Sequence, residues 1–280
     1  MRSLIVLLLL AAPLYAEPQS MDRSLIVLGI ADWKGNFAVD QAGRGGLAAL
    51  HTWKKQLELR VSQTGGNCIL VHAGALTGAD SVESFEAKLK LPAPGLTNYM
   101  DFSALGLSAE ELKFVSKENP LSVAWDATEK QKKSIVIQKA GQAILLSAFS
   151  SRTQSPERAI EGILQASATE QSSFNIILAA DGGAEQTLAH IPIDNVHESP
   201  EEFMKRTVII ESGSKNLFYR DPSGAFLCQV TGRTICYLEI KFRGSTITGI
   251  TQRFVDLNGV NEPAAFLKPD PILMELFKKP

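Results

Sequence analysis

Apolar positions along the chain change between continuous runs and helical spacing, which predicts a mixed α/β domain. Continuous runs, typical of strands buried on both faces, occur at Leu25–Ile30 and Asn67–His72. Between them, Leu47–Val61 carries an apolar residue at every third or fourth position, as an amphipathic helix does. The chain is therefore expected to begin its domain with a strand, a helix and a second strand.

The same kinds of pattern continue to about residue 255. A capping box that begins at Ser108 and a Ser-Pro step at Ser155 predict the starts of two further helices. A β-hairpin is expected to turn at Ala140-Gly141. The last third predicts a β meander, with strands at Ala225–Val230, Thr234–Phe242 and Thr246–Val255. Helices with two groups of strands favour a sandwich of sheets flanked by helices.

The first residues have the features of a secretory signal. Met1-Arg2 is basic, Leu4–Ala12 is apolar, and Ala16 provides the small residue at a cleavage site. We expect a signal peptide over 1–16, an N-terminal tail over 17–23, and a protein exported to the periplasm or secreted. An uncleaved membrane anchor is the alternative, although about 12 apolar residues are short for a bilayer span. No later apolar run is long enough to span a membrane.

Composition argues against a disordered chain and gives no reason to expect a nucleic-acid partner. The chain is 45% hydrophobic and 21% charged, which is typical of a folded globular protein and unlike a disordered one. Its net charge of -2 gives no electrostatic reason to expect a nucleic-acid partner.

The three cysteines allow one disulfide in an exported protein. Cys228 and Cys236 flank a turn-like segment, Thr231–Thr234, so they could lie on the two arms of one hairpin and form a bridge. The sequence leaves open whether the bridge forms. Cys68 lies in an apolar strand and is expected to be a buried small side chain.

Three segments carry a resemblance to a known family. They are the strand end and loop Ile30–Phe37, the glycine-rich helix entry Gly43–Ala48, and the turn, strand and glycine step Gly65–Ala75. Their order and spacing resemble the metallophosphatase (calcineurin-like phosphoesterase) domain of the 5′-nucleotidase family. The resemblance covers 24–257, which leaves 258–280 as a C-terminal extension. It implies an α/β fold of the four-layer αββα sandwich type.

The resemblance also implies a site for two divalent metals, which clamp a phosphate and activate water. Asp32 matches the family's first ligand, and Lys34 stands where the family has a histidine. The bridging aspartate is replaced by Ala75. Further ligand positions are occupied by Leu107, Ser108 and Ala180, and the last His-x-His motif retains at most His197. The metal-binding motifs are therefore degenerate, and no metal cofactor is expected.

Six residues remain as candidates for the residual cleft: Asp32, Trp33, Lys34, Asn36, His72 and His197. Lys34 either pairs with Asp32, offsetting the missing metal charge, or points to water. Trp33 either stacks on a ligand ring at the mouth of the site or covers the vacated metal cavity. His72 either reaches the site or packs in the core.

Three functions are compatible with these residues. The first is a catalytically inactive, exported protein that binds a small molecule, for example a nucleotide-like one, or an envelope protein through the vacated cleft. The second is an active phosphoesterase or 5′-nucleotidase that holds Mn or Zn through Asp32, His72 and His197. The third is a structural envelope scaffold that keeps the fold without a ligand.

Overall fold

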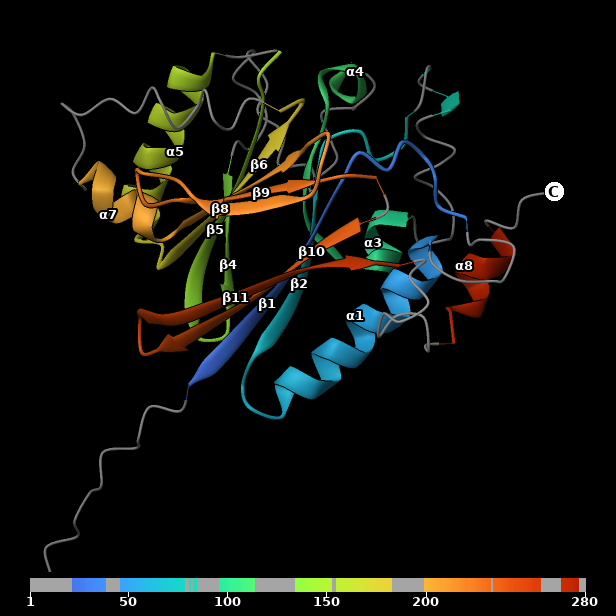
Figure 1. Ribbon diagram of the computed structural model, residues 1–280, viewed down its shortest axis with the longest axis horizontal. Coiled ribbons are helices and arrows are strands. Elements are labelled where there is room, and N and C mark those ends of the chain that lie inside the picture. The colour runs from blue at the N-terminus through green and yellow to red at the C-terminus, as the bar shows by residue number, and fades with distance from the viewer. Residues whose placement is uncertain are drawn as a thin grey trace, which may run out of the picture.

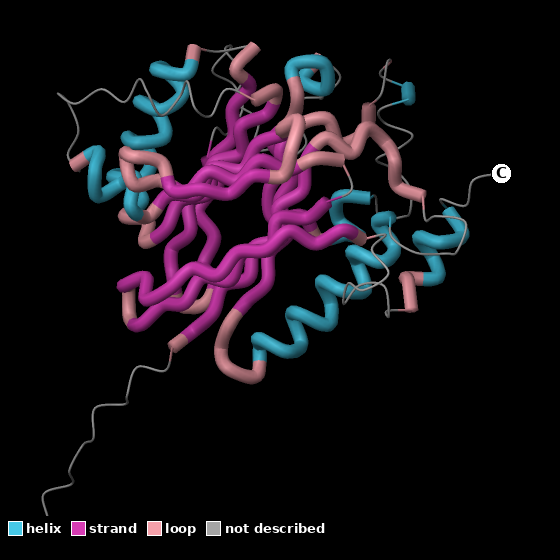
Figure 2. Tube along the Cα trace, in the orientation of Figure 1, coloured by secondary structure: helices cyan, strands magenta, loops and turns pink. Residues whose placement is uncertain are grey.

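Two β-sheets pack face to face between two layers of helices in the computed structural model (Figures 1 and 2). The structure describes residues 22–38, 46–78, 81, 83–84, 96–113, 134–152, 155–182, 199–232, 234–257 and 268–276 of the 280-residue chain. The predicted four-layer αββα sandwich is confirmed. The expected signal peptide and most of the C-terminal extension lie outside the described residues.

The first sheet, sheet A, has five strands in the order β11-β10-β1-β2-β3. Strands β1, β2 and β3 run parallel to one another, and β10 joins them antiparallel to β1. The bounds are β1 Arg23–Ala31, β2 Asn67–Ala73, β3 Phe102–Gly106, β10 Thr234–Arg243 and β11 Thr246–Asp256.

The second sheet, sheet B, has six strands in the order β4-β5-β6-β7-β9-β8. The four central strands are parallel, and β4 and β8 close the two edges antiparallel. The bounds are β4 Ser134–Lys139, β5 Gln142–Ser150, β6 Phe174–Ala180, β7 Thr207–Ser212, β8 Leu217–Arg220 and β9 Phe226–Val230.

Helices cover the outer face of each sheet (Figure 1). The outer face of sheet A packs against α1 and α8, while α5 and α7 cover sheet B. None of the described helices is long and apolar enough to cross a membrane. The bounds are α1 Gly46–Ser62, α3 Leu96–Met100, α4 Ala109–Leu112, α5 Pro156–Glu170, α7 Pro200–Lys205 and α8 Pro271–Leu276.

Strand β1 shows why the central strands read as continuous apolar runs. Ile26, Leu28 and Ile30 face the helical layer, whereas Leu25 and Val27 face sheet B. Successive side chains of a strand point to opposite faces, so a strand buried on both faces needs an apolar residue at every position. The core therefore consists of three apolar layers, one between the sheets and one under each set of helices.

The predicted β meander is wrong, because the chain changes sheets between its last strands. Strand β9 lies in sheet B, parallel to β7, whereas β10 lies in sheet A and pairs only with β1 and β11 among the described strands. Alternating apolar residues indicate that a strand is buried but not which neighbour it pairs with. Only β10 and β11 form the expected antiparallel pair.

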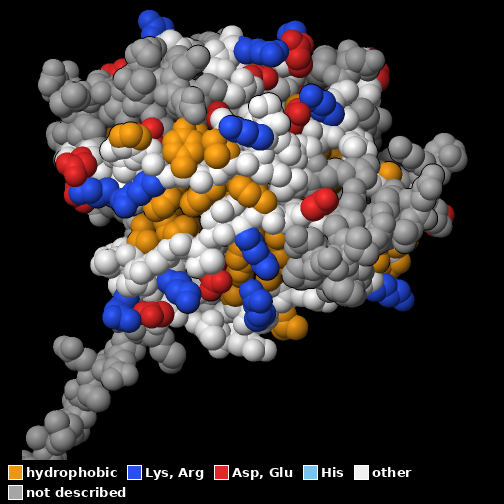
Figure 3. Space-filling view, viewed as in Figure 1, with side chains coloured by type: hydrophobic (Ala, Val, Ile, Leu, Met, Phe, Trp, Pro, Cys, Tyr) orange, Lys and Arg blue, Asp and Glu red, His pale blue; other side chains and the backbone are white. Residues whose placement is uncertain are grey.

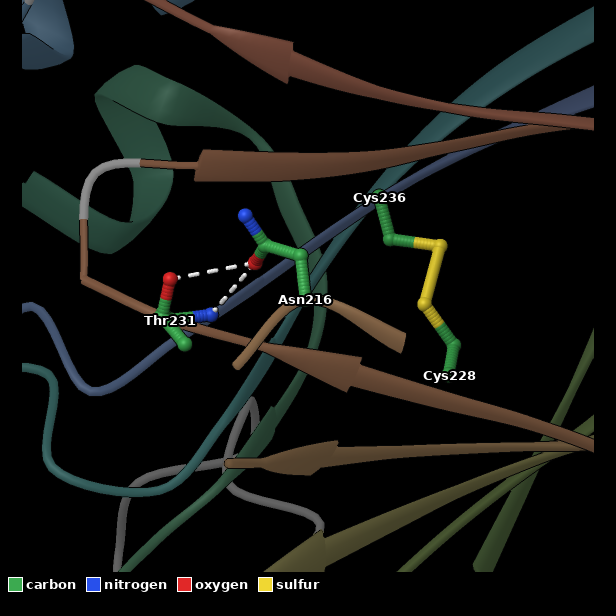
Figure 4. The surroundings of a disulfide bond; sticks show 4 residues. All are labelled: Asn216, Cys228, Thr231 and Cys236. Atoms are coloured by element: carbon green, nitrogen blue, oxygen red, sulfur yellow. Dashed lines mark hydrogen bonds between the residues drawn. A yellow bond between two sulfur atoms is a disulfide. The ribbon is translucent and has the colours of Figure 1, made fainter. Parts of the chain in front are cut away.

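A disulfide joins Cys228 of β9 to Cys236 of β10, and both residues are fully buried (Figure 4). The two cysteines do not lie on the arms of one hairpin, as the sequence suggested, but on two facing sheets. The bridge therefore connects sheet B to sheet A across the central apolar layer. Cys68 is free and buried, as expected.

Candidate functional site

A cleft of about 520 Å³ opens where the carboxyl ends of the parallel strands from both sheets meet. Ligand sites of α/β proteins lie at this end of the strands. Sheet A contributes residues that follow β1, β2 and β3, among them Asp32, Lys34, Ala75, Ser108, Glu110 and Glu111. Sheet B contributes residues at the ends of β5, β6 and β7, namely Arg152, Asp181 and Ser212.

The loop after β1 is held against the loop after β2 by backbone hydrogen bonds. The N–H groups of Asp32 and Lys34 donate to the carbonyl oxygens of Gly74 and Ala75, over 3.0 and 2.8 Å. Gly78 completes the contact, because a Cβ at this position would lie 2.8 Å from the Lys34 backbone. Gly78, which lies just after the segments that carry the resemblance, thus lets the two loops approach closely.

Several residues around the cleft have left-handed backbone conformations. The φ angles of Asp32, Lys34, Ala75 and Asp181 are 55°, 50°, 51° and 65°. Non-glycine residues seldom adopt this region, and it is concentrated at functional sites. Ala75 has no side-chain group that stabilises this conformation locally, whereas an aspartate does. The backbone at Ala75 thus has a left-handed conformation that suits the aspartate implied by the sequence resemblance better than it suits alanine.

Lys34 forms an ion pair with Asp32, with its Nζ 3.0 Å from the carboxylate Oδ1. The two side chains are 65% and 31% exposed. An exposed ion pair of this kind adds little to the stability of the fold, so what matters is where it places the Lys34 ammonium group. It places an ammonium group against the carboxylate that the sequence resemblance aligns with a metal ligand.

Glu111 is 2% exposed and ties the loop after β2 to the start of α4. Its Oε1 accepts hydrogen bonds from the N–H and hydroxyl of Thr77, over 2.7 and 3.0 Å. Its Oε2 accepts from the N–H and hydroxyl of Ser108, which completes the capping box predicted from the sequence. The Glu111 carboxylate therefore serves to hold two loops together.

Asp181 connects the two sheets across the cleft. Its Oδ2 accepts hydrogen bonds from the Ser150 hydroxyl at 2.6 Å and from the Ala109 N–H at 2.8 Å. Ser150 ends β5 in sheet B, and Ala109 begins α4 beside sheet A. The sequence analysis did not select Asp181 as a candidate for the cleft. Its position directly after the buried strand β6 was the signal that it lies at the cleft.

Positive charge in the cleft comes from Lys34 and from Arg152, which the sequence analysis did not single out. Glu110, on the same rim, is bonded to Lys113. The hydrogen bond and charge of Lys113, with a smaller contribution from Arg152, hold the pKa of the Glu110 carboxyl below its ordinary value. Two cations and four carboxylates thus line the described part of the cleft.

The donor set in the described part of the cleft does not fit the pair of divalent metals that the fold family implies. Within the described ranges, no three His, Cys, Asp or Glu side chains lie close enough to hold a metal ion. Asp32 is paired with Lys34, Asp181 and Glu111 accept hydrogen bonds from protein donors, and Ala75 has no ligand atom. Ala180 packs closely on Gly74: a Cβ added at Gly74 would lie 3.2 Å from the Cα of Ala180.

Of the five predicted cleft residues that the structure describes, Asp32 and Lys34 are the two that it brings together in the cleft. Asn36 is exposed but does not line it. Trp33 is 1% exposed and packs in the apolar layer under α1, so it neither stacks at the mouth nor covers the cavity. His197 lies outside the described residues.

His72 also lies away from the cleft. It is fully buried on β2, and its ring meets Phe102 edge-on at 6.5 Å. Neither ring nitrogen has a hydrogen-bond partner in the described part of the chain. Burial lowers the pKa of His72 from 6.5 to about 3, because a charged imidazolium would lose its hydration there. His72 is therefore a neutral core residue.

Comparisons with protein-family models and with curated protein sequences find no match. The structure, however, resembles solved ones. NAD nucleotidase (NadN) of Haemophilus influenzae has 16% sequence identity and a TM-score of 0.59 over 86% of this chain and 51% of its own. The 5′-nucleotidase precursor of Thermus thermophilus has 13% sequence identity and a TM-score of 0.60, over 90% of this chain and 57% of its own.

A shorter neighbour matches over nearly its whole length. The calcineurin-like phosphoesterase YfkN of Bacillus subtilis has 10% identity and a TM-score of 0.58, over 91% of this chain and 95% of its own. The chain spans little more than half the length of the two nucleotidases. It therefore has the metallophosphatase fold that 5′-nucleotidases and calcineurin-like phosphoesterases share.

Proposed function

We propose that the chain is an exported, catalytically inactive relative of these phosphoesterases, which binds a small molecule or an envelope protein in the cleft without metal. The observation that carries the proposal is the Asp32–Lys34 ion pair beside Ala75. In a working metallophosphatase site these positions would supply carboxylate and imidazole ligands. Here they supply one carboxylate, already paired with an ammonium.

The cleft nevertheless has the size and groups that a ligand needs. About 520 Å³ is within the range of small-molecule sites. Lys34 and Arg152 offer cationic groups, while Ser108 and Ser212 lie in the same lining. The carboxylates favour a ligand that also carries hydroxyl or amino donors. A nucleotide, with its phosphate and ribose hydroxyls, has both kinds of group.

Export is supported by the apolar N-terminal run and by the disulfide between Cys228 and Cys236. Disulfides persist in oxidising compartments such as the periplasm and are rare in the cytosol. Mass spectrometry of the protein from a periplasmic extract is expected to find an N-terminus at Glu17. A cytosolic protein that retains Met1 would contradict the export proposal.

Thermal unfolding with AMP in the presence of EDTA tests metal-free binding. A ligand that binds only the folded state stabilises it by about 2.7 kcal/mol at one hundred times its Kd. We expect AMP to raise the Tm, and we expect Arg152→Ala to abolish the rise. Lys268→Ala is the control, because Lys268 is exposed and lies outside the cleft lining.

Three outcomes separate the candidate functions. A rise in Tm with EDTA present supports metal-free binding. A rise that requires Mn²⁺, with phosphoester turnover that is lost in Asp32→Ala, supports the active hydrolase instead. No response to ligands or metal, together with a stable complex with another envelope protein, supports the structural scaffold.

A further inference from the structure

The end of the sandwich opposite the cleft carries a concentration of cationic side chains. The cleft lies at the carboxyl ends of the parallel strands, and this end lies at their amino ends, where β1 and β2 begin. Figure 3 shows Lys and Arg side chains along the lower edge of the visible face. Four of the cationic residues are exposed and Lys139 is half-buried. We call this set the basic end: Arg23, Arg60, Lys139, Lys241 and Arg243.

Three turns meet around the start of β1 and bring these cations onto one surface. The Arg23 guanidinium packs on Gly141, in the turn between β4 and β5, where an added Cβ would collide with it. The side-chain amide of Gln142, beside the same turn, donates a 2.5 Å hydrogen bond to the carbonyl oxygen of Gly244 between β10 and β11. A Cβ added at Gly65, in the turn after α1, would lie 3.8 Å from the Nε of Arg23. The ends of α1, β4 and β10 therefore lie close together.

Few carboxylates neutralise these cations. Asp22 forms an ion pair with Arg243, with its Oδ1 3.0 Å from the Nε. Arg23, Lys139 and Lys241 have no ion pair with any described residue. Two further carboxylates border this surface: Glu170 and Glu239. Five cations against three carboxylates give this end an excess of positive charge, although the net charge of the whole chain is -2.

An exposed leucine lies beside the basic end. Leu59 is 68% exposed and lies in the last turn of α1, next to Arg60. Of the large apolar side chains that the structure describes, only Leu59 and Ile272 are exposed. Helices that bind membrane surfaces place apolar side chains beside basic ones, because the apolar group enters the bilayer while the cations meet anionic headgroups. A hydrophilic polyanion would use the cations but would leave Leu59 in water.

We infer that the basic end docks on the surface of a bilayer that contains anionic phospholipids, with Leu59 entering the headgroup region. Each Lys or Arg near such a surface strengthens binding by about fivefold. The chain also enters the domain at this end. Asp22 lies ten positions after Ala12, where the apolar N-terminal run ends, and an extended segment of that length spans about 35 Å at most. A run held in the membrane during export therefore keeps the basic end near the bilayer. The cleft would open away from the bilayer, and the inference does not depend on its ligand.

Co-sedimentation with vesicles tests the inference on residues 17–280, which contain the whole described domain but not the apolar run. We expect binding to phosphatidylcholine vesicles with about 30% phosphatidylglycerol, release by about 0.5 M NaCl, and no binding to phosphatidylcholine alone. Arg23→Glu/Lys241→Glu is expected to weaken binding by about 25-fold or more, because two cations are lost. Lys215→Glu/Lys268→Glu, which makes the same change in net charge, is the control and should bind like the wild type. Lys215 and Lys268 are exposed, and they lie after β7 and before α8, away from the basic end.

The variant Leu59→Gln separates a bilayer from a soluble polyanion. We expect it to weaken binding to the anionic vesicles by about tenfold and to leave binding to dextran sulfate unchanged. Because Leu59 is exposed, this variant should keep the wild-type Tm, so the test holds even if the charge reversals disturb folding.

Four results would overturn the inference. The wild type may fail to sediment with the anionic vesicles, or it may sediment equally with phosphatidylcholine alone. The control pair may weaken binding as much as Arg23→Glu/Lys241→Glu does. Finally, binding to dextran sulfate, with vesicle binding that Leu59→Gln leaves unchanged, would identify a surface for soluble polyanions instead.

Discussion

Replacing His72 with leucine is expected to make the stability of the protein less sensitive to acid. In the folded state this imidazole is fully buried, has no hydrogen-bond partner among the described residues, and has its pKa lowered to about 3. In the unfolded chain it takes up a proton near pH 6.5. Between these two values the unfolded state binds one more proton than the folded state, so acid favours unfolding.

The size of the effect follows from the two pKa values. The stability due to neutral His72 is fully present above pH 6.5 and is lost as the pH falls toward 3. Each pH unit within this window is equivalent to about 1.4 kcal/mol. The loss is therefore about 2 kcal/mol at pH 5 and about 5 kcal/mol over the whole window. His72→Leu removes this contribution and leaves those of all other groups in place.

Urea unfolding between pH 7.5 and pH 4.5 measures the difference, with His72→Gln as a polar variant that does not titrate. The difference in unfolding free energy between His72→Leu and the wild type should shift in favour of the variant by about 1.4 kcal/mol for each pH unit below 6.5. His72→Gln should show the same gain from a lower starting stability. Parallel profiles for wild type and His72→Leu would mean that the imidazole is solvated or bonded, which would make it a candidate cleft ligand again.

Two further variants test the links that hold the cleft and the sheets. The double variant Cys228→Ala/Cys236→Ala should lower the free energy of unfolding by about 2.5 kcal/mol, from the entropy of a loop with a sequence separation of 8; equal urea midpoints with and without reductant would contradict it. Glu111→Gln should cost about 2 kcal/mol, because an amide nitrogen replaces an oxygen that accepts from Thr77 or Ser108. An unchanged urea midpoint would show that the carboxylate is not needed there.

The elements of the fold that could be predicted are those with a strong local pattern. Strands β1 and β2 are buried on both faces, and α1 has one apolar stripe, so the spacing of their residues fixes their type. The capping box at Ser108 was also visible, because it needs only residues three positions apart. Short, half-buried elements such as β8 and α8 carry too few residues for a period to show.

What the sequence could not predict was which distant segments meet. Cys228 and Cys236 are eight positions apart, yet they belong to different sheets. Asp181 and Arg152 reach the cleft only because the ends of β6 and β5 lie opposite those of sheet A. Local patterns contain no information about these long-range pairings, which depend on how the two sheets stack.

The sequence left the position of His72 open between the site and the core, and strand alternation explains the position that the structure shows. It lies at the same parity on β2 as Cys68 and Leu70, which face the helical layer. The resemblance to a metal-binding family directed attention to its imidazole instead. A strand residue is best assigned to a face by parity before its chemistry is considered.

The central claim, that the cleft works without metal, is tested most directly by metal analysis of the purified protein. The full chain is equilibrated with Mn²⁺ and Zn²⁺, dialysed, and analysed by elemental mass spectrometry, with Asp32→Ala treated in parallel. We expect both proteins to retain well below one equivalent of metal and to have the same Tm with and without EDTA. Two equivalents of Mn or Zn in the wild type, reduced in Asp32→Ala, would contradict the claim.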